Sequence, residues 1–106
     1  MTSTSNLFRR VNPISGEVAS EAPAQTPDEA IAAVDAAARA MPAWAAQGPN
    51  ARRAALLKAA DAVSSKGDAF VTAMMAEIGA TEAWARFNVM LAASMLREAA
   101  SLTSQV

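Results

Sequence analysis

The stretch EIGATEAWARFNVMLAASMLREAA, residues 77–100, limits the possible folds of this chain more than any other feature. It is typical of a helix, yet residues 87–96 carry no charge and the stretch has no clear water-facing side. In the helix predicted over residues 81–104, the helical period places apolar side chains on two faces: Trp84, Phe87, Leu91, Met95 and Leu102 on one, and Val89, Ala92, Leu96 and Ala99 on the other. Because a helix with two apolar faces belongs between packed layers, we expect both faces to be covered.

The N-terminal residues predict a short β-hairpin. After a disordered tail at residues 1–6, residues 7–11 and 17–22 have the pattern of two short strands. The turn between them contains Pro13, which fixes φ, and Gly16, which permits a positive φ. Since an isolated hairpin is only marginally stable in water, we expect this one to lie on another element.

Four helices are predicted after the hairpin, so the expected fold is mostly α. Thr26, Pro27 and Glu29 form a capping-box pattern that starts the first helix, and Pro42 is expected to end or kink it. Its apolar stripe consists of Ile31, Val34, Ala38 and Met41.

The other three helices follow from similar patterns. The second begins at Pro49, and residues 64–67 break its pattern. The third ends just before Gly79, because glycine is favoured directly after a helix. The fourth spans residues 81–104. The second helix has the stripe Leu56, Ala59, Ala60 and Val63, and the third has Val71, Met74, Met75 and Ile78.

Composition excludes several classes of function. The chain has 106 residues, enough for one small domain, and a net charge of −1 without a basic block, so we expect no nucleic-acid partner. No apolar run approaches the roughly 18 residues that span a bilayer, so we expect no membrane partner. The chain has no Cys and no His, which removes thiol nucleophiles, His general bases and common zinc sites and fits a cytoplasmic location.

Catalytic motifs are missing from the sequence. The four glycines lie too far apart for a phosphate-binding loop or a dinucleotide fingerprint. Glu77 and Glu82 flank a predicted helix junction, where two solvated helix-end carboxylates are the better interpretation than a general acid–base pair.

The order of the motifs resembles the N-terminal segment of the aldehyde dehydrogenase superfamily. An NPISGEV hairpin at residues 12–18 is followed by a Met-x-x-Trp step at 41–44, an Arg-x-x-Leu-Leu helix at 53–57 and a Glu-x-Gly turn at 77–79. The resemblance covers residues 8–106. The segment WARFNVMLAASMLREAASLTSQV is most similar to the aromatic-aldehyde branch, which includes salicylaldehyde, benzaldehyde and vanillin dehydrogenases. Ala80 and Thr81 stand where many members have Lys-Pro.

The resemblance implies a partial piece of the α/β aldehyde dehydrogenase fold, with residues 7–106 as an incomplete N-terminal part of its NAD(P)-binding domain. Such enzymes oxidise aldehydes to acids through a cysteine thiolate, with hydride transfer to NAD or NADP. The groups for this chemistry lie beyond Val106 in the family pattern, so no catalytic residue and no cofactor binding are expected for these 106 residues alone. The implied partner is the remainder of such a chain or a second copy.

The resemblance also implies two candidate sites. The fourth helix lines part of the family's substrate tunnel, where Phe87 and Leu91 would face the tunnel with Met90 or Met95 nearby; the alternative is that these residues are only core. Some members hold a structural monovalent cation, here at Glu77 with backbone carbonyls near Arg10 and Val11; the alternative is a solvated Glu77. Arg86 is expected to pair with Glu82 one turn away.

Two hypotheses from different classes remain open at this point. In the first, the chain is an N-terminal segment of an NAD(P)-dependent aldehyde dehydrogenase, without activity of its own. In the second, it is a stand-alone helical module whose apolar faces bury against another copy or another protein. The exact aldehyde, the choice between NAD and NADP, and the oligomeric state are left undecided by the sequence.

Overall fold

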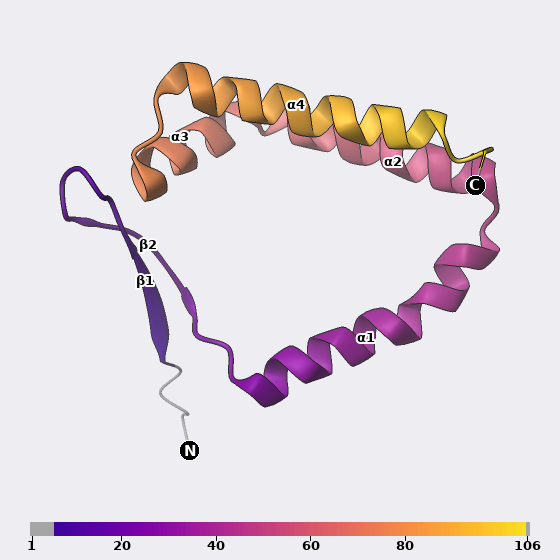
Figure 1. The fold of residues 1–106 in the computed structure, drawn as a ribbon, viewed down its shortest axis with the longest axis horizontal. Coiled ribbons are helices and arrows are strands. Elements are labelled where there is room, and N and C mark those ends of the chain that lie inside the picture. Colours follow the sequence, from indigo (N-terminus) through magenta and orange to yellow (C-terminus); the bar gives the residue numbers. More distant parts are fainter. Residues whose placement is uncertain (1–5, 106) are drawn as a thin grey trace.

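The computed structural model describes residues 6–105 and confirms a two-stranded hairpin followed by four helices (Figure 1). The strands are β1 (Leu7–Val11) and β2 (Val18–Pro23). The expected disordered tail, residues 1–6, lies outside the described residues except for Asn6, whose carbonyl accepts a hydrogen bond from the Ala24 N–H at 2.7 Å. The helices are α1 (Pro27–Ala46), α2 (Pro49–Ser65), α3 (Gly67–Ile78) and α4 (Glu82–Ser101).

The hairpin is antiparallel and contains one irregularity. Arg10 lies opposite Ser20 and Val11 lies opposite Val18, so Ala19 is an extra residue on β2. The side chain of Asn12 shapes the turn by accepting hydrogen bonds from the Ile14 and Ser15 N–H groups, at 2.8 and 3.1 Å. The hairpin lies against α3, as expected because an isolated hairpin would be only marginally stable.

Helix α1 begins as its sequence predicts but continues past Pro42. The Thr26 hydroxyl accepts from the Glu29 N–H, and the Glu29 carboxylate accepts from the Thr26 N–H, which completes the capping box. Of the two outcomes expected at Pro42, an end or a kink, the end does not occur, because the helix continues to Ala46. Within the described residues, no side chain of α1 is buried.

Helices α2 and α4 form the main packed unit, with α3 against one end of α4 (Figure 1). The predicted stripe of α2 is covered, with Ala60 buried and Leu56, Ala59 and Val63 partly buried. In α3, Val71 is buried and Met74 partly buried, whereas Met75 and Ile78 are exposed. Helix α4 ends at Ser101, three residues before the predicted end, and the Thr103 hydroxyl donates to the Ala100 carbonyl at 2.9 Å.

The chain as a whole is open and flat. Its principal extents are 47 × 43 × 18 Å and its radius of gyration is 17.8 Å, whereas a compact domain of this length has about 13 Å. Helix α1 spans from the hairpin to α2 and closes one side of a ring around an opening (Figure 1). Among residues 6–105, no helix is long and apolar enough to cross a membrane.

Candidate functional site

The covered face of α4 is built from small residues rather than from the large ones. Ala85, Ala93 and Ala100 are buried, and Val89 and Leu96 are partly buried between them. Alanine side chains let two helix backbones approach closely, which suits the packing of α4 against α2. The second face predicted for α4 is therefore only half right, because Val89 and Leu96 are covered while Ala92 and Ala99 are exposed.

The opposite side of α4 carries the large apolar residues, and we call it the outer stripe. Its members repeat every three or four residues and then after seven: Trp84, Phe87, Leu91, Met95 and Leu102. They are between 41% and 63% exposed, so the expectation that both faces of this helix are covered is wrong for this face within residues 6–105, because no described element packs over it. Trp84 and Phe87 stack on each other with ring centroids 5.5 Å apart. The stripe is an apolar surface from Trp84 to Met95 with an aromatic end, and Glu98 lies between Met95 and Leu102 on the same face.

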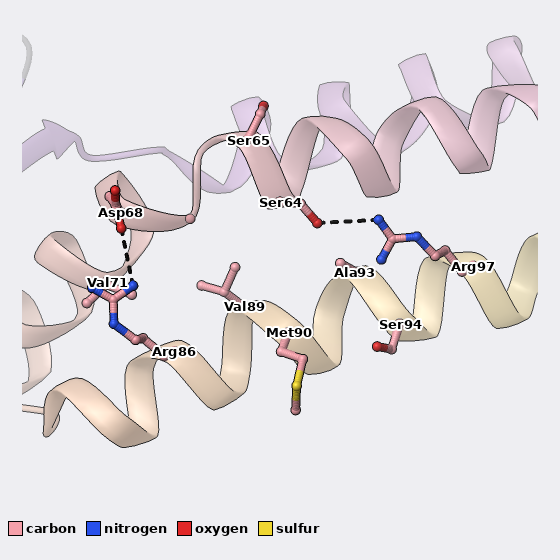
Figure 2. A pocket seen from close by; sticks show the side chains of 11 residues that line it. Ser64, Ser65, Asp68, Val71, Arg86, Val89, Met90, Ala93, Ser94 and Arg97 are labelled. Atoms are coloured by element: carbon pink, nitrogen blue, oxygen red, sulfur yellow. Dashed lines mark hydrogen bonds and ion pairs between the residues drawn. The ribbon is translucent and has the colours of Figure 1, made fainter.

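Of the four predicted tunnel residues, the structure brings three together and separates one. Phe87, Leu91 and Met95 share the outer stripe at successive intervals of four residues. Met90 lies about 100° around the helix from Leu91. Its side chain lines a groove between α2, α3 and α4 with a volume of about 390 Å³, alongside Val71 and Val89 (Figure 2).

Two arginines of α4 border this groove, and both are paired. Arg86 contacts Glu82 at 2.8 Å, as predicted. It also contacts Asp68 of α3 at 3.2 Å (Figure 2). The hydrogen bond with Glu82, and then the one with Asp68, raise the pKa of Arg86 above its ordinary value.

The second arginine, Arg97, contacts Asp61 of α2 at 3.3 Å. It also donates to the Ser64 hydroxyl at 3.5 Å (Figure 2). Its partners belong to α2, and those of Arg86 belong to α3 and to α4 itself. Both guanidinium groups therefore have carboxylate partners, and these ion pairs connect α2, α3 and α4.

The predicted cation site places Glu77 among protein partners. Its carboxylate accepts a hydrogen bond from the Ser20 hydroxyl at 2.6 Å, and the Arg10 guanidinium lies 4.0 Å away. The side chain of Glu77 is 29% exposed, which differs from a freely solvated carboxylate. Among residues 6–105, no three His, Cys, Asp or Glu residues gather as metal ligands. A positive charge beside Glu77 fits a second cation poorly, and a bound cation there stays a prediction.

Sequence patterns miss the side-chain role of Arg10 and the part that Ser20 plays. The family resemblance assigns only the backbone of Arg10, whereas in the structure its side chain joins the cluster at Glu77. The available signal is the hairpin register, since residues opposite each other on paired strands point to the same face. The groove between α2, α3 and α4 has no local sequence signal, because its lining comes from three helices.

Comparison with known proteins identifies the family. A sequence model of the aldehyde dehydrogenase family matches residues 1–106. The chain is 52% identical over 99 residues to a vanillin dehydrogenase of Pseudomonas fluorescens, and 43% identical over 105 residues to a salicylaldehyde dehydrogenase of Pseudomonas putida. These matches cover 93% and 99% of this chain but 20% and 22% of the relatives. The chain belongs to the aldehyde dehydrogenase family and spans about a fifth of the length of these relatives.

The fold agrees with a solved structure of the same family. The crystal structure of a salicylaldehyde dehydrogenase from Pseudomonas putida G7, complexed with salicylaldehyde, superposes with a TM-score of 0.90 at 44% identity. The match covers 94% of this chain and 21% of that chain. The hairpin and four helices therefore form a partial piece of the aldehyde dehydrogenase fold.

Proposed function

We propose that this chain is the N-terminal part of an NAD(P)-dependent enzyme that oxidises aromatic aldehydes to carboxylic acids, and that it has no activity alone. Residues 7–106 would form an incomplete part of the NAD(P)-binding domain, working in the cytoplasm without nucleic-acid or membrane partners. Membership of the family supports the reaction, and the vanillin and salicylaldehyde dehydrogenases among the relatives support an aromatic substrate.

The open shape is the observation that carries the proposal. A radius of gyration of 17.8 Å, against about 13 Å for a compact domain, means that much apolar surface is left without a protein layer over it. The outer stripe of α4 and the exposed side chains of α1 belong to this surface. The remaining four-fifths of a family member would supply the missing layers.

The absence of chemistry in these residues supports the second half of the proposal. Oxidation in this family uses a cysteine thiolate, and the chain contains no Cys and no His. The NAD or NADP that the complete enzymes use therefore has no reacting partner here. The expected contribution of the segment is structural, together with part of the substrate tunnel.

The outer stripe is where we place that part of the tunnel. Phe87, Leu91 and Met95 share this stripe, and the Trp84 ring stacked on Phe87 extends it. An aromatic wall suits an aromatic aldehyde because ring stacking adds to apolar burial. Met90 is less suited to the same wall, because it lines the groove on another side of α4.

An activity assay tests the proposal on the chain itself. The purified 106-residue chain is incubated with vanillin, salicylaldehyde or benzaldehyde and with NAD⁺ or NADP⁺, and the carboxylic acid is measured by chromatography. We expect no acid above the protein-free control. Aldehyde-dependent acid formation by the chain alone would disprove the proposal.

The exposed apolar surface also favours a second candidate, a non-catalytic helical module that associates with itself or another protein. Light scattering after size-exclusion chromatography, together with thermal unfolding, separates the two candidates. A discrete dimer with cooperative unfolding favours the module. A chain that stays monomeric, with the outer stripe uncovered, favours the enzyme segment.

A further inference from the structure

The hairpin joins α3 through a cluster of three polar side chains. The Ser20 hydroxyl of β2 donates to the Glu77 carboxylate of α3 at 2.6 Å, and it accepts from the Arg10 guanidinium of β1 at 3.2 Å. The same guanidinium nitrogen lies 4.0 Å from the same carboxylate oxygen. Two strands and a helix therefore meet around one carboxylate, which has a hydroxyl and a positive charge beside it.

Arg10 is held in this position by contacts on β1 and β2. It lies directly opposite Ser20 in the hairpin register, so the two side chains project from the same face. Its guanidinium also lies over the ring of Phe8, 5.9 Å from the centroid, in a cation–π contact. The register shift directly after Arg10 changes the strand geometry beyond this pair. The positive charge at Glu77 is thus fixed by the fold of the hairpin.

We propose that the guanidinium of Arg10 replaces a bound monovalent cation at Glu77 and makes this corner a metal-free joint between the hairpin and α3. A hard cation requires several oxygen ligands at short distance, and here one carboxylate oxygen already accepts from Ser20. A cation on that oxygen would also be close to the positively charged guanidinium of Arg10. Because the Glu77 side chain is partly buried, dissolved salt screens the attraction between Arg10 and Glu77 less than it screens a surface ion pair.

Arg9 supplies the matched control for Arg10. It is the neighbouring residue on β1 and forms its own ion pair, with Glu21 of β2 at 2.8 Å. The Arg9 side chain is 63% exposed, and its partner belongs to the hairpin rather than to α3. Arg9→Met removes one positive charge from the hairpin without touching the joint, whereas Arg10→Met removes the charge at the joint and keeps an unbranched apolar stem.

The first experiment asks whether the wild-type chain binds a monovalent cation. ²³Na NMR line widths are recorded while NaCl is added to the 106-residue chain, and KCl is then added as a competitor. We expect line broadening that rises without saturation and does not respond to K⁺ beyond the change in ionic strength. Saturable broadening that K⁺ relieves would overturn the proposal, and this measurement requires no variant to fold.

The second experiment measures how firmly the hairpin is attached. Amide hydrogen exchange of residues 6–24 and 74–80 is compared in NaCl, KCl and choline chloride at equal ionic strength. For the wild type we expect rates that agree within about twofold in the three salts, and for Arg10→Met rates about tenfold higher in all three. Arg10→Lys should recover most of the protection because it restores the charge, and Arg9→Met should change the rates by less than about threefold.

Two results of the exchange experiment would contradict a metal-free joint. Slower amide exchange of the wild type in NaCl or KCl than in choline chloride would show that a bound ion, rather than Arg10, balances the charge of Glu77. Equal rates for Arg10→Met and Arg9→Met would show that Arg10 does not hold the hairpin on α3.

Discussion

Trp84 and Phe87 stack on the outer stripe of α4 with 5.5 Å between ring centroids and 27° between ring planes. Both rings remain about half exposed, although stacked aromatic side chains usually contribute to a covered core. The fully buried residues of the same helix are alanines, with Val89 and Leu96 partly buried between them. Helix α4 therefore holds its small residues against α2 and presents its large ones outward, as expected for a helix that lies between two layers in a larger fold.

The two sides of α4 should respond differently to a charge. Ala93 is buried, so Ala93→Glu should lower the free energy of unfolding by at least about 3 kcal/mol, because it places an unpaired charge and extra volume against α2. Leu91→Glu on the outer stripe should lower it by less than about 1 kcal/mol. Urea unfolding followed by circular dichroism measures both values. Similar losses for the two variants would show that the outer stripe is covered in the isolated chain.

The contact between the hairpin turn and the end of α3 depends on Gly79. This residue has φ +68°, and a Cβ there would lie 3.0 Å from Ile14 Cδ1 and 3.1 Å from Pro13 Cγ. Gly79→Ala should therefore lower the free energy of unfolding by about 1–2 kcal/mol for the backbone conformation and by about 1 kcal/mol more for the crowding.

A double-mutant cycle with Ile14→Ala separates these two effects. Ile14 is 80% exposed, so Ile14→Ala alone should change stability little, but it should reduce the loss caused by Gly79→Ala. The measurement is the coupling free energy between the two substitutions from urea unfolding. Additive effects would indicate that the hairpin turn does not press on Gly79.

Helix α1 should be stabilised by the loss of its proline. Pro42 lies inside a helix that has no buried side chain among the described residues, so intrinsic helix propensity should dominate there. Pro42→Ala restores a backbone hydrogen-bond donor and should favour the helical state by up to about 3 kcal/mol locally. Amide exchange of residues 38–46 should slow, and the helical circular dichroism signal should rise. Faster exchange would mean that Pro42 makes a packing contact that the structure does not contain.

The helices and strands of this fold could be predicted because each start and stop signal lies within a few neighbouring residues of the sequence. The capping box of Thr26 and Glu29 forms as predicted, and the break between α2 and α3 lies where the pattern placed it. The covered face of α4 was harder to predict, because alanines such as Ala85 and Ala93 give little hydrophobic signal beside Phe87 and Leu91. The larger residues of the outer stripe have no covering layer within residues 6–105, so hydrophobicity alone does not indicate which face is covered here.

The candidate sites were harder still to predict, because their residues lie far apart in the sequence. Ser20 and Glu77 are 57 residues apart in the sequence, so no periodic pattern links them. The resemblance to a family indicated Glu77 but not the side chain of Arg10, because a cation and a guanidinium satisfy the same carboxylate. The separation of Met90 from Leu91 follows from helical geometry, but the groove that Met90 lines exists only once three helices are packed.

The ion pairs of Arg86 should contribute the same stability from pH 6 to pH 10. Its pKa is raised by Glu82 first and then by Asp68, so the contribution is present below the pKa of the unfolded chain and is lost only as the pH rises through the still higher folded value. The difference in free energy of unfolding between the wild type and Arg86→Met should be equal at pH 6, 8 and 10. A difference that shrinks by pH 10 would contradict this assignment. Added salt should reduce it at every pH, because the pairs are exposed.

The most direct test of the central claim is a chimera in which these 106 residues replace the matching segment of the Pseudomonas fluorescens vanillin dehydrogenase. The chimera should fold and oxidise vanillin, because the segment supplies the same part of the fold. Leu91→Glu should abolish folding or activity in the chimera, although the isolated chain is expected to tolerate it, because the outer stripe would then be covered by the rest of the enzyme. Vanillate formation by the chimera with and without this substitution is the measurement. An active chimera that Leu91→Glu leaves unchanged, or a chimera that does not fold, would contradict the account.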